Sequence, residues 1–397
     1  MTDAILVINA GSTSLKFAVY GADPSNALPV LCRGEIAEMQ DGARFTVVDM
    51  TGKAFGRRDW GKGHAIDHKT ALHFVVTWLE ANIAGLKIVA AGHRIVLGGE
   101  RFDGPALIDG GVLDYLDGLS AMEPSHQKFN VGGARAIAEA FTQLPQVACF
   151  DNTFHRTMPE VARTYALPKD VRAAGVRHWG YHGISFDYIA RQMARTAPEA
   201  RRVIMAHLGG GASLCAMLDG RSIETTMGFA GVSGLTMATR SGDVPPGVLF
   251  YLLRTGRFDA ASLEDMLYKR SGLLGLSETT GDMKTLQDSD DPRAVVAVEH
   301  FVYSMTKYAG AYASVLGGLD AFVFTGGIGE HSAKVRAALG SRLAWLGVKI
   351  DDDANAADAN CISTPDSRVS VWVIPTDEEL MIAHHTWQLV GHGQAVA

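Results

Sequence analysis

The sequence predicts an α/β fold with mixed sheets. Short apolar runs typical of buried strands alternate with segments whose apolar residues recur at helical spacing. Two strand–turn–strand units of similar composition lie about half a chain apart. Clusters of glycine and small polar residues follow several predicted strands, which is where ligands of α/β sheets bind.

The individual elements follow from the apolar pattern. Predicted strands cover residues 4–9, 15–20, 87–91, 146–150, 202–207, 213–217, 321–324 and 369–374. Predicted helices cover residues 71–83, 134–141, 188–194, 247–253, 295–316, 333–343 and 378–389. No linker or low-complexity stretch stands out, and we expect a hinge near residue 150, where a strand ends.

The two strand–turn–strand units suggest an internal duplication. Superposing Ser14 on Ser213 gives an offset of 199 residues (213 − 14), which also places Gly11 on Gly210. Glycine-rich hairpins are common, so this pattern alone leaves both duplication and coincidence open.

Composition limits the class of protein. The 397 residues suggest two to three domains at about 150 residues per domain. The net charge of −7 argues against a nucleic-acid partner, and a polyanionic ligand would need a local concentration of basic groups. The four cysteines are far apart and form no C-x-x-C pair, which argues against a zinc or redox motif. Without a signal peptide or an apolar run of about 18 residues, we expect a cytoplasmic protein that does not contact a membrane.

Several polar clusters begin where predicted strands end. They are Asn9 with residues 11–14 (Gly-Ser-Thr-Ser), Arg94, Asp151, Gly209–Gly211, and Thr325–Glu330. Small residues with exposed backbone N–H groups suit phosphate oxygens. The sequence contains no G-x-x-x-x-G-K-[ST] motif, no protein-kinase H-R-D and D-F-G pair, and no complete G-x-G-x-x-G, because Ser332 replaces its last glycine. Any nucleotide site is therefore built from separated glycine turns.

These clusters carry a resemblance to the acetate and propionate kinases. The matching segments, in order along the chain, are 9–17 (NAGSTSLKF), 92–96 (GHRIV), 150–155 (FDNTFH), 180–183 (GYHG), 207–209 (HLG), 239–243 (TRSGD), 271–275 (SGLLG), 324–330 (FTGGIGE) and 374–380 (IPTDEEL). The match is colinear from about residue 5 to 383, without a large gap.

The resemblance implies a fold, an activity and ligands. The fold is that of actin, sugar kinases and heat-shock ATPases: two duplicated ribonuclease-H-like α/β domains that close on ATP. We expect an acyl-substrate domain at 1–150 plus 380–397 and a nucleotide-binding domain at 151–379. The implied reaction is reversible transfer of the ATP γ-phosphoryl group to acetate or another short-chain fatty acid, giving an acyl phosphate and ADP. The implied ion is Mg²⁺, with Mn²⁺ as an alternative, and the implied assembly is a homodimer.

The resemblance also implies roles for individual residues. The catalytic set is Asp151, His182 and Arg240. The acyl substrate would contact Arg94, Val96, His126, Tyr181 and Gly231. ATP would contact Lys16, His207, Leu208, Gly209, Gly210, Gly211, Asp282, Met283, Lys284, Gly326, Gly327, Ile328, Gly329 and Glu330. The metal would be held by Asn9 and Glu378.

Each role has an ordinary structural alternative. Guanidinium groups suit carboxylates and phosphoryl groups, although most arginines form surface ion pairs. Asp151 could cap a helix; if catalytic, it more easily orients the metal or nucleophile than removes a proton, because a fatty-acid carboxylate is already ionised. Without the resemblance, Asn9 would be read as a turn residue and Glu378 as a first-turn helix charge. Lys16 could be a solvated strand lysine, and His182 could bind only a backbone carbonyl.

The chain departs from the family pattern at several positions. They are Leu97, Ser125, Gln127, Lys128, Gly210, Gly231, Ser233, Pro245 and Lys284, together with Tyr181 in place of the usual Phe. Small side chains at Ser125 and Gly231 predict a wider acyl pocket. The alternatives are therefore a propionate or butyrate kinase of the same fold, a sugar or hydroxyl kinase, and a catalytically weakened ATP-binding paralogue. The paired arginines argue against the sugar kinase, which would need a general base.

Overall fold

The computed structural model describes residues 2–11, 13–22 and 28–394, so the expected turn residue Ser12 lies outside the described residues. The chain divides into two compact units. Unit 1 comprises Met1–Thr153 and Asp377–Ala397, and unit 2 comprises Phe154–Thr376. These limits differ by three residues from the expected ones (153 against 150, and 376 against 379). As a result, Asp151 and Glu378, which we expected in the second domain, belong to unit 1.

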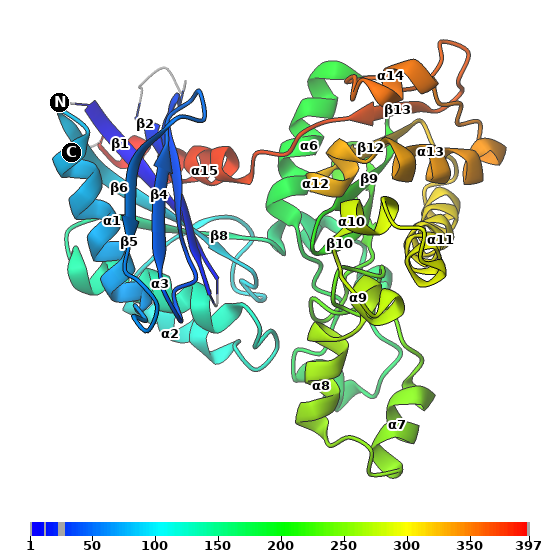
Figure 1. Cartoon of the computed structure of the whole chain (residues 1–397), viewed down its shortest axis with the longest axis horizontal. Helices are drawn as coiled ribbons and strands as arrows, with labels where there is room; N and C mark the ends of the chain where they lie inside the picture. Colours follow the sequence, from blue (N-terminus) through cyan, green and yellow to red (C-terminus); the bar gives the residue numbers. More distant parts are fainter. Residues whose placement is uncertain (1, 12, 23–27, 395–397) are drawn as a thin grey trace. The chain divides into compact units, whose positions relative to one another are not determined.

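Unit 1 is built on an eight-stranded mixed sheet with the order β5-β4-β3-β2-β1-β6-β8-β7. Its strands are β1 (Thr2–Ala10), β2 (Leu15–Gly21), β3 (Val30–Ala37), β4 (Arg44–Val48), β5 (Ala54–Asp59), β6 (Leu86–Ile95), β7 (Ala106–Leu107) and β8 (Gln146–Phe150). Its helices are α1 (His68–Asn82), α2 (Gly110–Gly118), α3 (Gln127–Ala140) and α15 (Glu378–Gln394). The red C-terminal helix α15 packs against the blue N-terminal strands (Figure 1).

Unit 2 is built on a five-stranded sheet with the order β11-β10-β9-β12-β13. Its strands are β9 (Arg202–Leu208), β10 (Ala212–Leu218), β11 (Arg221–Thr225), β12 (Ala321–Thr325) and β13 (Ser370–Val373). Its helices are α4 (Glu160–Arg163), α5 (Lys169–Ala173), α6 (Gly183–Thr196), α7 (Pro246–Arg254), α8 (Ala260–Lys269), α9 (Gly272–Ser277), α10 (Met283–Gln287), α11 (Pro292–Val315), α12 (Gly326–His331), α13 (Ala333–Arg342) and α14 (Asp352–Ala356). Short 3₁₀ turns occupy Thr153–Thr157, at the unit boundary, and Ala344–Leu346.

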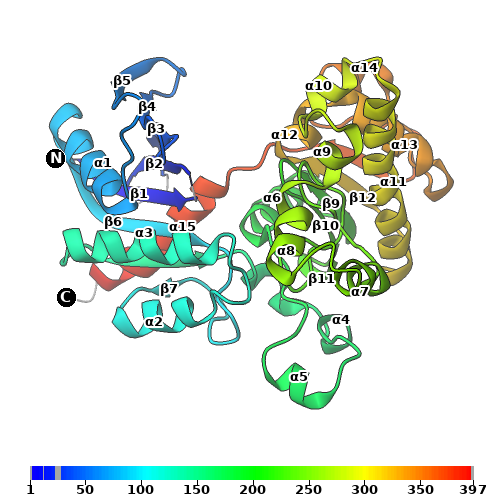
Figure 2. The ribbon, with the colours of Figure 1, turned by 60° about the horizontal axis from the view of Figure 1, so that its bottom comes forward.

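Helices cover both faces of each sheet, as the alternation of strand residues requires. In unit 1, Ala91 packs in the cluster that includes α1, whereas a Cβ on its neighbour Gly92 would strike Thr386 and Ile382 of α15. In unit 2, Val203 and Met205 pack against α6, and α11 covers the other face of β9 and β10 (Figure 2). Each sheet therefore has apolar side chains packed against both of its faces. The ends of its strands remain available for polar groups.

The strand order confirms the duplicated frame. In unit 1, β3-β2-β1-β6-β8 consists of an antiparallel meander followed by two strands parallel to β1. In unit 2, β11-β10-β9-β12-β13 repeats this arrangement around β9. A single offset of 199 residues is wrong, however, because the hairpin turns differ in length. Four residues separate the paired Ala10 and Leu15, but three separate Leu208 and Ala212.

Some elements escaped sequence analysis. The strands β3, β4 and β5 carry charged side chains on a solvent-facing side, so their apolar alternation is short and incomplete. Their pairing is fixed by the antiparallel meander and by Trp78, which packs so closely on Gly56 that a Cβ there would lie 2.3 Å from its ring. The glycine-rich segment 326–331, which we treated as a loop, forms the short helix α12.

Candidate active site

Polar residues in unit 1 gather at the carboxyl ends of its parallel strands. Asn9 lies near the end of β1, Arg94 near the end of β6, and Asp151 directly follows β8. Because β1, β6 and β8 run parallel, these ends share one edge of the sheet. Glu378 begins α15, which packs on the same strands. The sheet therefore brings together residues that lie far apart in the sequence.

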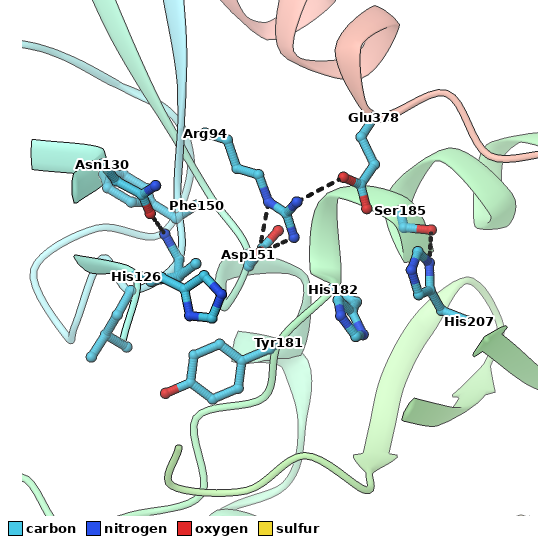
Figure 3. Close-up of polar contacts among 12 residues, drawn as sticks. Arg94, His126, Asn130, Phe150, Asp151, Tyr181, His182, Ser185, His207 and Glu378 are labelled. Atoms are coloured by element: carbon cyan, nitrogen blue, oxygen red, sulfur yellow. Dashed lines mark hydrogen bonds and ion pairs between the residues drawn. The ribbon is translucent and has the colours of Figure 1, made fainter. Parts of the chain in front are cut away.

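Arg94 is held between two carboxylates (Figure 3). Its Nε and Nη2 donate to Asp151 Oδ2 at 3.1 and 2.8 Å. Its Nη1 lies 3.1 Å from Glu378 Oε2. The Asp151 side chain is 1% exposed, whereas those of Arg94 and Glu378 are 19% and 14% exposed. The guanidinium is thus fixed in position but still reachable from solvent.

The electrostatics of this group favour a bound cation. Burial alone disfavours a charged guanidinium, but Asp151 and Glu378 outweigh it and raise the pKa of Arg94 above its ordinary value. One arginine and two carboxylates sum to +1 − 2 = −1 when all are ionised. An anionic ligand would be repelled by this net negative charge unless a positive charge were added nearby.

Asn9 and Glu378 supply oxygen donors suited to Mg²⁺. This ion usually binds one or two protein carboxylates and fills its other positions with water and phosphate oxygens. Among residues 2–11, 13–22 and 28–394, no group of three or more His, Cys, Asp or Glu side chains could hold a metal. An amide and one carboxylate therefore fit an ion held mostly by substrate phosphates, and do not fit a closed all-protein metal site.

The loop that follows β6 is held by buried side-chain amides that sequence analysis did not identify as functional. The contacts are Val96 N to Asn130 Oδ1 (3.1 Å), Leu97 N to Gln127 Oε1 (3.1 Å) and Gly98 N to Asn152 Oδ1 (2.7 Å). Gln127 also donates to the carbonyls of Leu97 and Leu116, and Asn130 donates to the carbonyl of Ala10. Each amide satisfies backbone groups that would otherwise be buried without partners. Burial was the missing signal, because nothing in the local sequence shows that the side chains of Gln127, Asn130 and Asn152 are buried.

In unit 2, three features converge on the turn after β9. A Cβ built on Gly211 would lie 3.3 Å from His182 Nε2 and 3.7 Å from Arg240 Nη1. His182 Nδ1 bonds to Ser213 Oγ at 2.8 Å, and Arg240 Nη1 donates to the carbonyl of Gly231 at 2.8 Å. His182 is also the N-cap of α6 in a left-handed conformation (φ 58°), which non-glycine residues seldom adopt. Backbone N–H groups at the N-terminus of a helix such as α6 suit an anion.

His207 and Glu330 belong to a second polar chain in unit 2. Ser185 Oγ lies 2.9 Å from both His207 Nδ1 and Thr376 Oγ1 (Figure 3 shows the contact with His207). Glu330 Oε1 accepts from the backbone N–H groups of Gly326 at 2.8 Å and Thr376 at 3.2 Å. These bonds connect the end of β9, the start of α12 and the segment after β13.

A cavity of about 710 Å³ opens beside the glycine turn of unit 2. It is lined by Gly209, Gly210, Ala238, Thr239, Gly281, Asp282, Met283, Lys284, Gln287, Gly327, Ile328, His331 and Ser332. Its size falls in the range of small-molecule sites. Seven of the residues expected to contact ATP line it: Gly209, Gly210, Asp282, Met283, Lys284, Gly327 and Ile328.

The other residues expected to contact ATP are not among those that line this cavity. In unit 2, Leu208 is fully buried, His207 and Glu330 form the polar chain above, and Gly211 faces His182. Lys16 is in unit 1, in a hollow of about 320 Å³ that Arg33 also lines. Gly326 and Gly329 pack closely on backbone instead of lining the cavity. At Gly326 (φ 74°) a Cβ would lie 2.8 Å from the carbonyl oxygen of Leu208, so only glycine allows α12 to start against β9.

Arg336 also positions the cavity wall, a role that sequence analysis missed. Its fully buried guanidinium donates to the carbonyls of Gly329 and Glu330 at 3.0 and 2.8 Å. It also bonds to Asn355 and Asp358 near α14. All five N–H donors are therefore used: two hold the end of α12, and three join it to Asn355 and Asp358.

The residues expected to contact the acyl group are divided between the units. Val96 and His126 belong to unit 1, and Tyr181 and Gly231 belong to unit 2. The Tyr181 hydroxyl donates to the carbonyl of Phe229 at 2.7 Å. In this structure that hydroxyl is therefore used in a backbone contact.

Comparisons with known proteins place the chain in a family. Residues 4–384 match the profile of the Acetokinase family. An acetate kinase from Rhodopseudomonas palustris (strain ATCC BAA-98 / CGA009) is 46% identical over 400 residues, covering 99% of this chain and 100% of that protein. One from Rhizobium meliloti is 43% identical over 390 residues, covering 98% of each.

Solved structures agree. A propionate kinase from Francisella tularensis superposes with a TM-score of 0.90 at 35% identity, covering 97% of this chain and 99% of that one. The acetate kinase of Porphyromonas gingivalis gives a TM-score of 0.88 at 33% identity, covering 98% and 100%. This chain belongs to the acetokinase family of kinases that transfer phosphate to a carboxylate.

Proposed function

We propose that this protein is an acetate kinase that reversibly transfers the γ-phosphoryl group of ATP to acetate. The observation that carries the proposal is the Arg94–Asp151–Glu378 group in a chain of this family. An arginine fixed by two carboxylates at a strand edge is a preorganised partner for a small carboxylate, provided that a cation balances the charge. The alternative acceptors are propionate and butyrate.

Unit 2 would bind the nucleotide. The 710 Å³ cavity accommodates a nucleoside, and backbone N–H groups of the Gly209–Gly211 turn suit its phosphates. His182 and Arg240 adjoin that turn and would donate hydrogen bonds to the phosphoryl group in transfer. Because Glu330 accepts hydrogen bonds from the backbone N–H groups of Gly326 and Thr376, we propose that it holds the start of α12 in addition to the ATP contact that the resemblance implies.

Unit 1 would bind the acid. Arg94 would orient the carboxylate, and Val96 would contact its methyl group, with the Val96 backbone fixed by Asn130. Mg²⁺, when bound to Asn9, Glu378 and the phosphates, supplies positive charge to the transferring group. Asp151 already accepts two hydrogen bonds from Arg94, so we propose that it orients this arginine instead of acting as a general base.

Phosphoryl transfer between two such ligands needs positioning and charge stabilisation more than covalent catalysis. We therefore propose direct in-line transfer without a phosphoenzyme. Stereochemical analysis with chiral γ-phosphate ATP should show inversion at phosphorus. Net retention would contradict the mechanism.

The activity itself is tested by a hydroxamate assay with ATP, Mg²⁺ and acetate, propionate or butyrate as acceptor. We expect acyl phosphate from acetate. Preference for a longer acid would make the protein a propionate or butyrate kinase of the same fold. Nucleotide binding without any acyl phosphate would identify the catalytically weakened paralogue.

Assembly and location remain predictions. Within the described part of the chain, no helix is both long enough and apolar enough to cross a membrane. We propose a cytoplasmic homodimer, as the family resemblance implies. The outer face of α7, with Phe250 and Tyr251 about 60% exposed, is an apolar surface that a second copy could cover. Sedimentation of the protein and of a Phe250→Ser, Tyr251→Ser variant would test this.

A further inference from the structure

The turn before α3 contains a buried carboxylate that has no role in the site described so far. Glu123 is 1% exposed, and its Oε1 accepts a hydrogen bond from the Ser125 hydroxyl. Ser125 Oγ lies 2.7 Å from His126 Nδ1, which is also 3.2 Å from Glu123 Oε1. Three side chains within four residues therefore form one hydrogen-bonded group in unit 1.

For an ionised Glu123, the chemistry of these groups sets where the protons lie. An ionised carboxylate can only accept, so Ser125 donates its hydroxyl hydrogen to Glu123. Ser125 Oγ is then left to accept, and His126 must carry the proton on Nδ1 that it donates to this oxygen and to Glu123. Nε2 becomes the ring nitrogen left for a ligand. A serine nucleophile would instead donate its proton to the imidazole, so this is not a nucleophilic Ser–His pair.

The backbone beneath the group is fixed independently. Gln127 N donates to the Glu123 carbonyl at 3.1 Å, and the Gln127 and Asn130 side chains bind the loop after β6. His126 is the N-cap residue of α3 but makes no side-chain cap hydrogen bond. The helix thus fixes the backbone position of His126, while the contacts at Nδ1 set the orientation of its partly exposed ring.

We propose that Glu123 and Ser125 are positioning residues for His126, which they hold by Nδ1 so that Nε2 meets an oxygen of the acyl substrate. This inference rests on the proposed function, in which His126 contacts that substrate. Removing the Glu123 carboxylate frees the His126 ring to rotate. A smaller fraction of the molecules then has the ring in the productive orientation. Ser125 therefore orients His126, in addition to widening the acyl pocket through its small side chain.

A double-mutant cycle tests the proposal. Glu123→Ala should lower kcat/KM for the acid by about tenfold or more, the scale of one lost hydrogen bond to a charged group. In a His126→Ala background the same change should have an effect of less than about twofold, because a coupled pair loses its interaction only once. Glu123→Gln keeps an acceptor oxygen and should rescue most of the activity. Glu139→Ala, which removes an exposed acid from α3 in the same unit, is the matched control.

Two outcomes would overturn the proposal: wild-type kcat/KM in Glu123→Ala, or an equal loss in both backgrounds, which would indicate a purely structural role. ¹⁵N shifts of the His126 ring in the ligand-free protein give a readout independent of activity and of the proposed function. They should show a protonated Nδ1 in the wild type and altered tautomer populations in Ser125→Ala, even where Glu123→Ala does not fold. A proton confined to Nε2 in the wild type would refute the arrangement. Loss of activity in His126→Ala alone tests the proposed function separately.

Discussion

Units 1 and 2 share an arrangement of five strands, but the residues at the carboxyl ends of those strands differ in chemistry. At the carboxyl edge of unit 1, charged side chains bind one another, with Arg94 between Asp151 and Glu378. At the corresponding edge of unit 2, the glycine turn after β9 exposes backbone, and imidazoles and one guanidinium stand around it. The frame determines where a ligand binds, and the residues after each strand determine which ligand it is.

The difference matches the ligands that we propose. A nucleotide carries several phosphate oxygens along an extended chain, which suits many weak backbone donors. A small acid offers one carboxylate, which suits one strongly fixed guanidinium. Unit 1 therefore depends on a few side chains and unit 2 on backbone shape, and substitutions should affect the two units differently.

The largest difference is expected between the two arginines. Arg94→Ala and Arg240→Ala should each lower kcat/KM by about 10²-fold or more, the effect of losing a preorganised donor. Arg94→Ala should also lower the free energy of unfolding by about 3–5 kcal/mol, because it removes the cation that donates two hydrogen bonds to the buried Asp151. Kinetics and denaturant unfolding measure the two effects.

Arg→Lys at either position should restore activity only in part, since an ammonium cannot make the paired contacts. Arg195→Ala, an exposed change on α6, is the control. The comparison fails if Arg240→Ala destabilises the protein as much as Arg94→Ala does. Near-wild-type activity in either alanine variant would remove that arginine from the active site.

Each unit also contains a buried histidine that should make stability depend on pH, His93 in unit 1 and His155 in unit 2. Burial lowers the pKa of His93 in unit 1 to about 4 and that of His155 in unit 2 to about 3. Since the unfolded chain protonates these rings near pH 6.5, their neutral forms favour the folded state above pH 6.5. That stability is lost as the pH falls from 6.5 towards 4 for His93 and towards 3 for His155.

At about 1.4 kcal/mol per pH unit, the loss for His93 is on the order of 3 kcal/mol. Urea unfolding at pH 7, 5.5 and 4.5 should therefore show a falling midpoint, and His93→Gln should flatten the dependence. The exposed His64→Gln is the matched control. An unchanged slope in His93→Gln would show that other groups determine the acid sensitivity. Because the chain has two units, the transitions should be followed by more than one probe.

Sequence analysis identified most residues at the strand edges, but not the residues that hold them. Arg94, Asp151 and Gly209 follow apolar runs, so their position could be predicted from local pattern. Gln127, Asn130 and Arg336 act through burial and through contacts with loops far away in the chain, and nothing local marks them. Lys16 stands within a family motif and lines a hollow of unit 1, and the contact with ATP that the resemblance implies for it stays a prediction.

A smaller difference concerns which unit sets the preferred acid. Val96 and Ser125 in unit 1, and Tyr181 and Gly231 in unit 2, are the residues expected around the acyl chain. Hydrophobic pockets discriminate one methylene by only about 1–3 kcal/mol, so the small Ser125 and Gly231 should let propionate compete with acetate. Gly231→Pro keeps the carbonyl that Arg240 uses and should shift kcat/KM towards acetate.

The measurement is kcat/KM for acetate, propionate and butyrate on the wild type, Gly231→Pro and Ser125→Leu. Ser125→Leu should also weaken catalysis, because Ser125 bonds to Glu123 and His126. If kcat/KM for acetate exceeds that for the longer acids by more than tenfold and Gly231→Pro changes nothing, unit 2 does not set the acid preference. The prediction of a wider acyl pocket is then wrong.

The smallest expected effect comes from restoring a side chain to the glycine turn of unit 2. Gly210 stands where the family usually has asparagine, and a Cβ built there meets no atom within 4 Å. Gly210→Asn should therefore fold without strain and add an amide donor beside the phosphates. A hydrogen bond to a charged group contributes about 1.5–3 kcal/mol at most, reduced here by solvent, so the KM for ATP should fall only a few-fold. Gly247→Asn, at the exposed start of α7 in the same unit, is the control, because a Cβ there also meets no atom within 4 Å. A rise in the KM for ATP would mean that this turn needs glycine for close approach of the nucleotide, and that unit 2 relies on backbone alone.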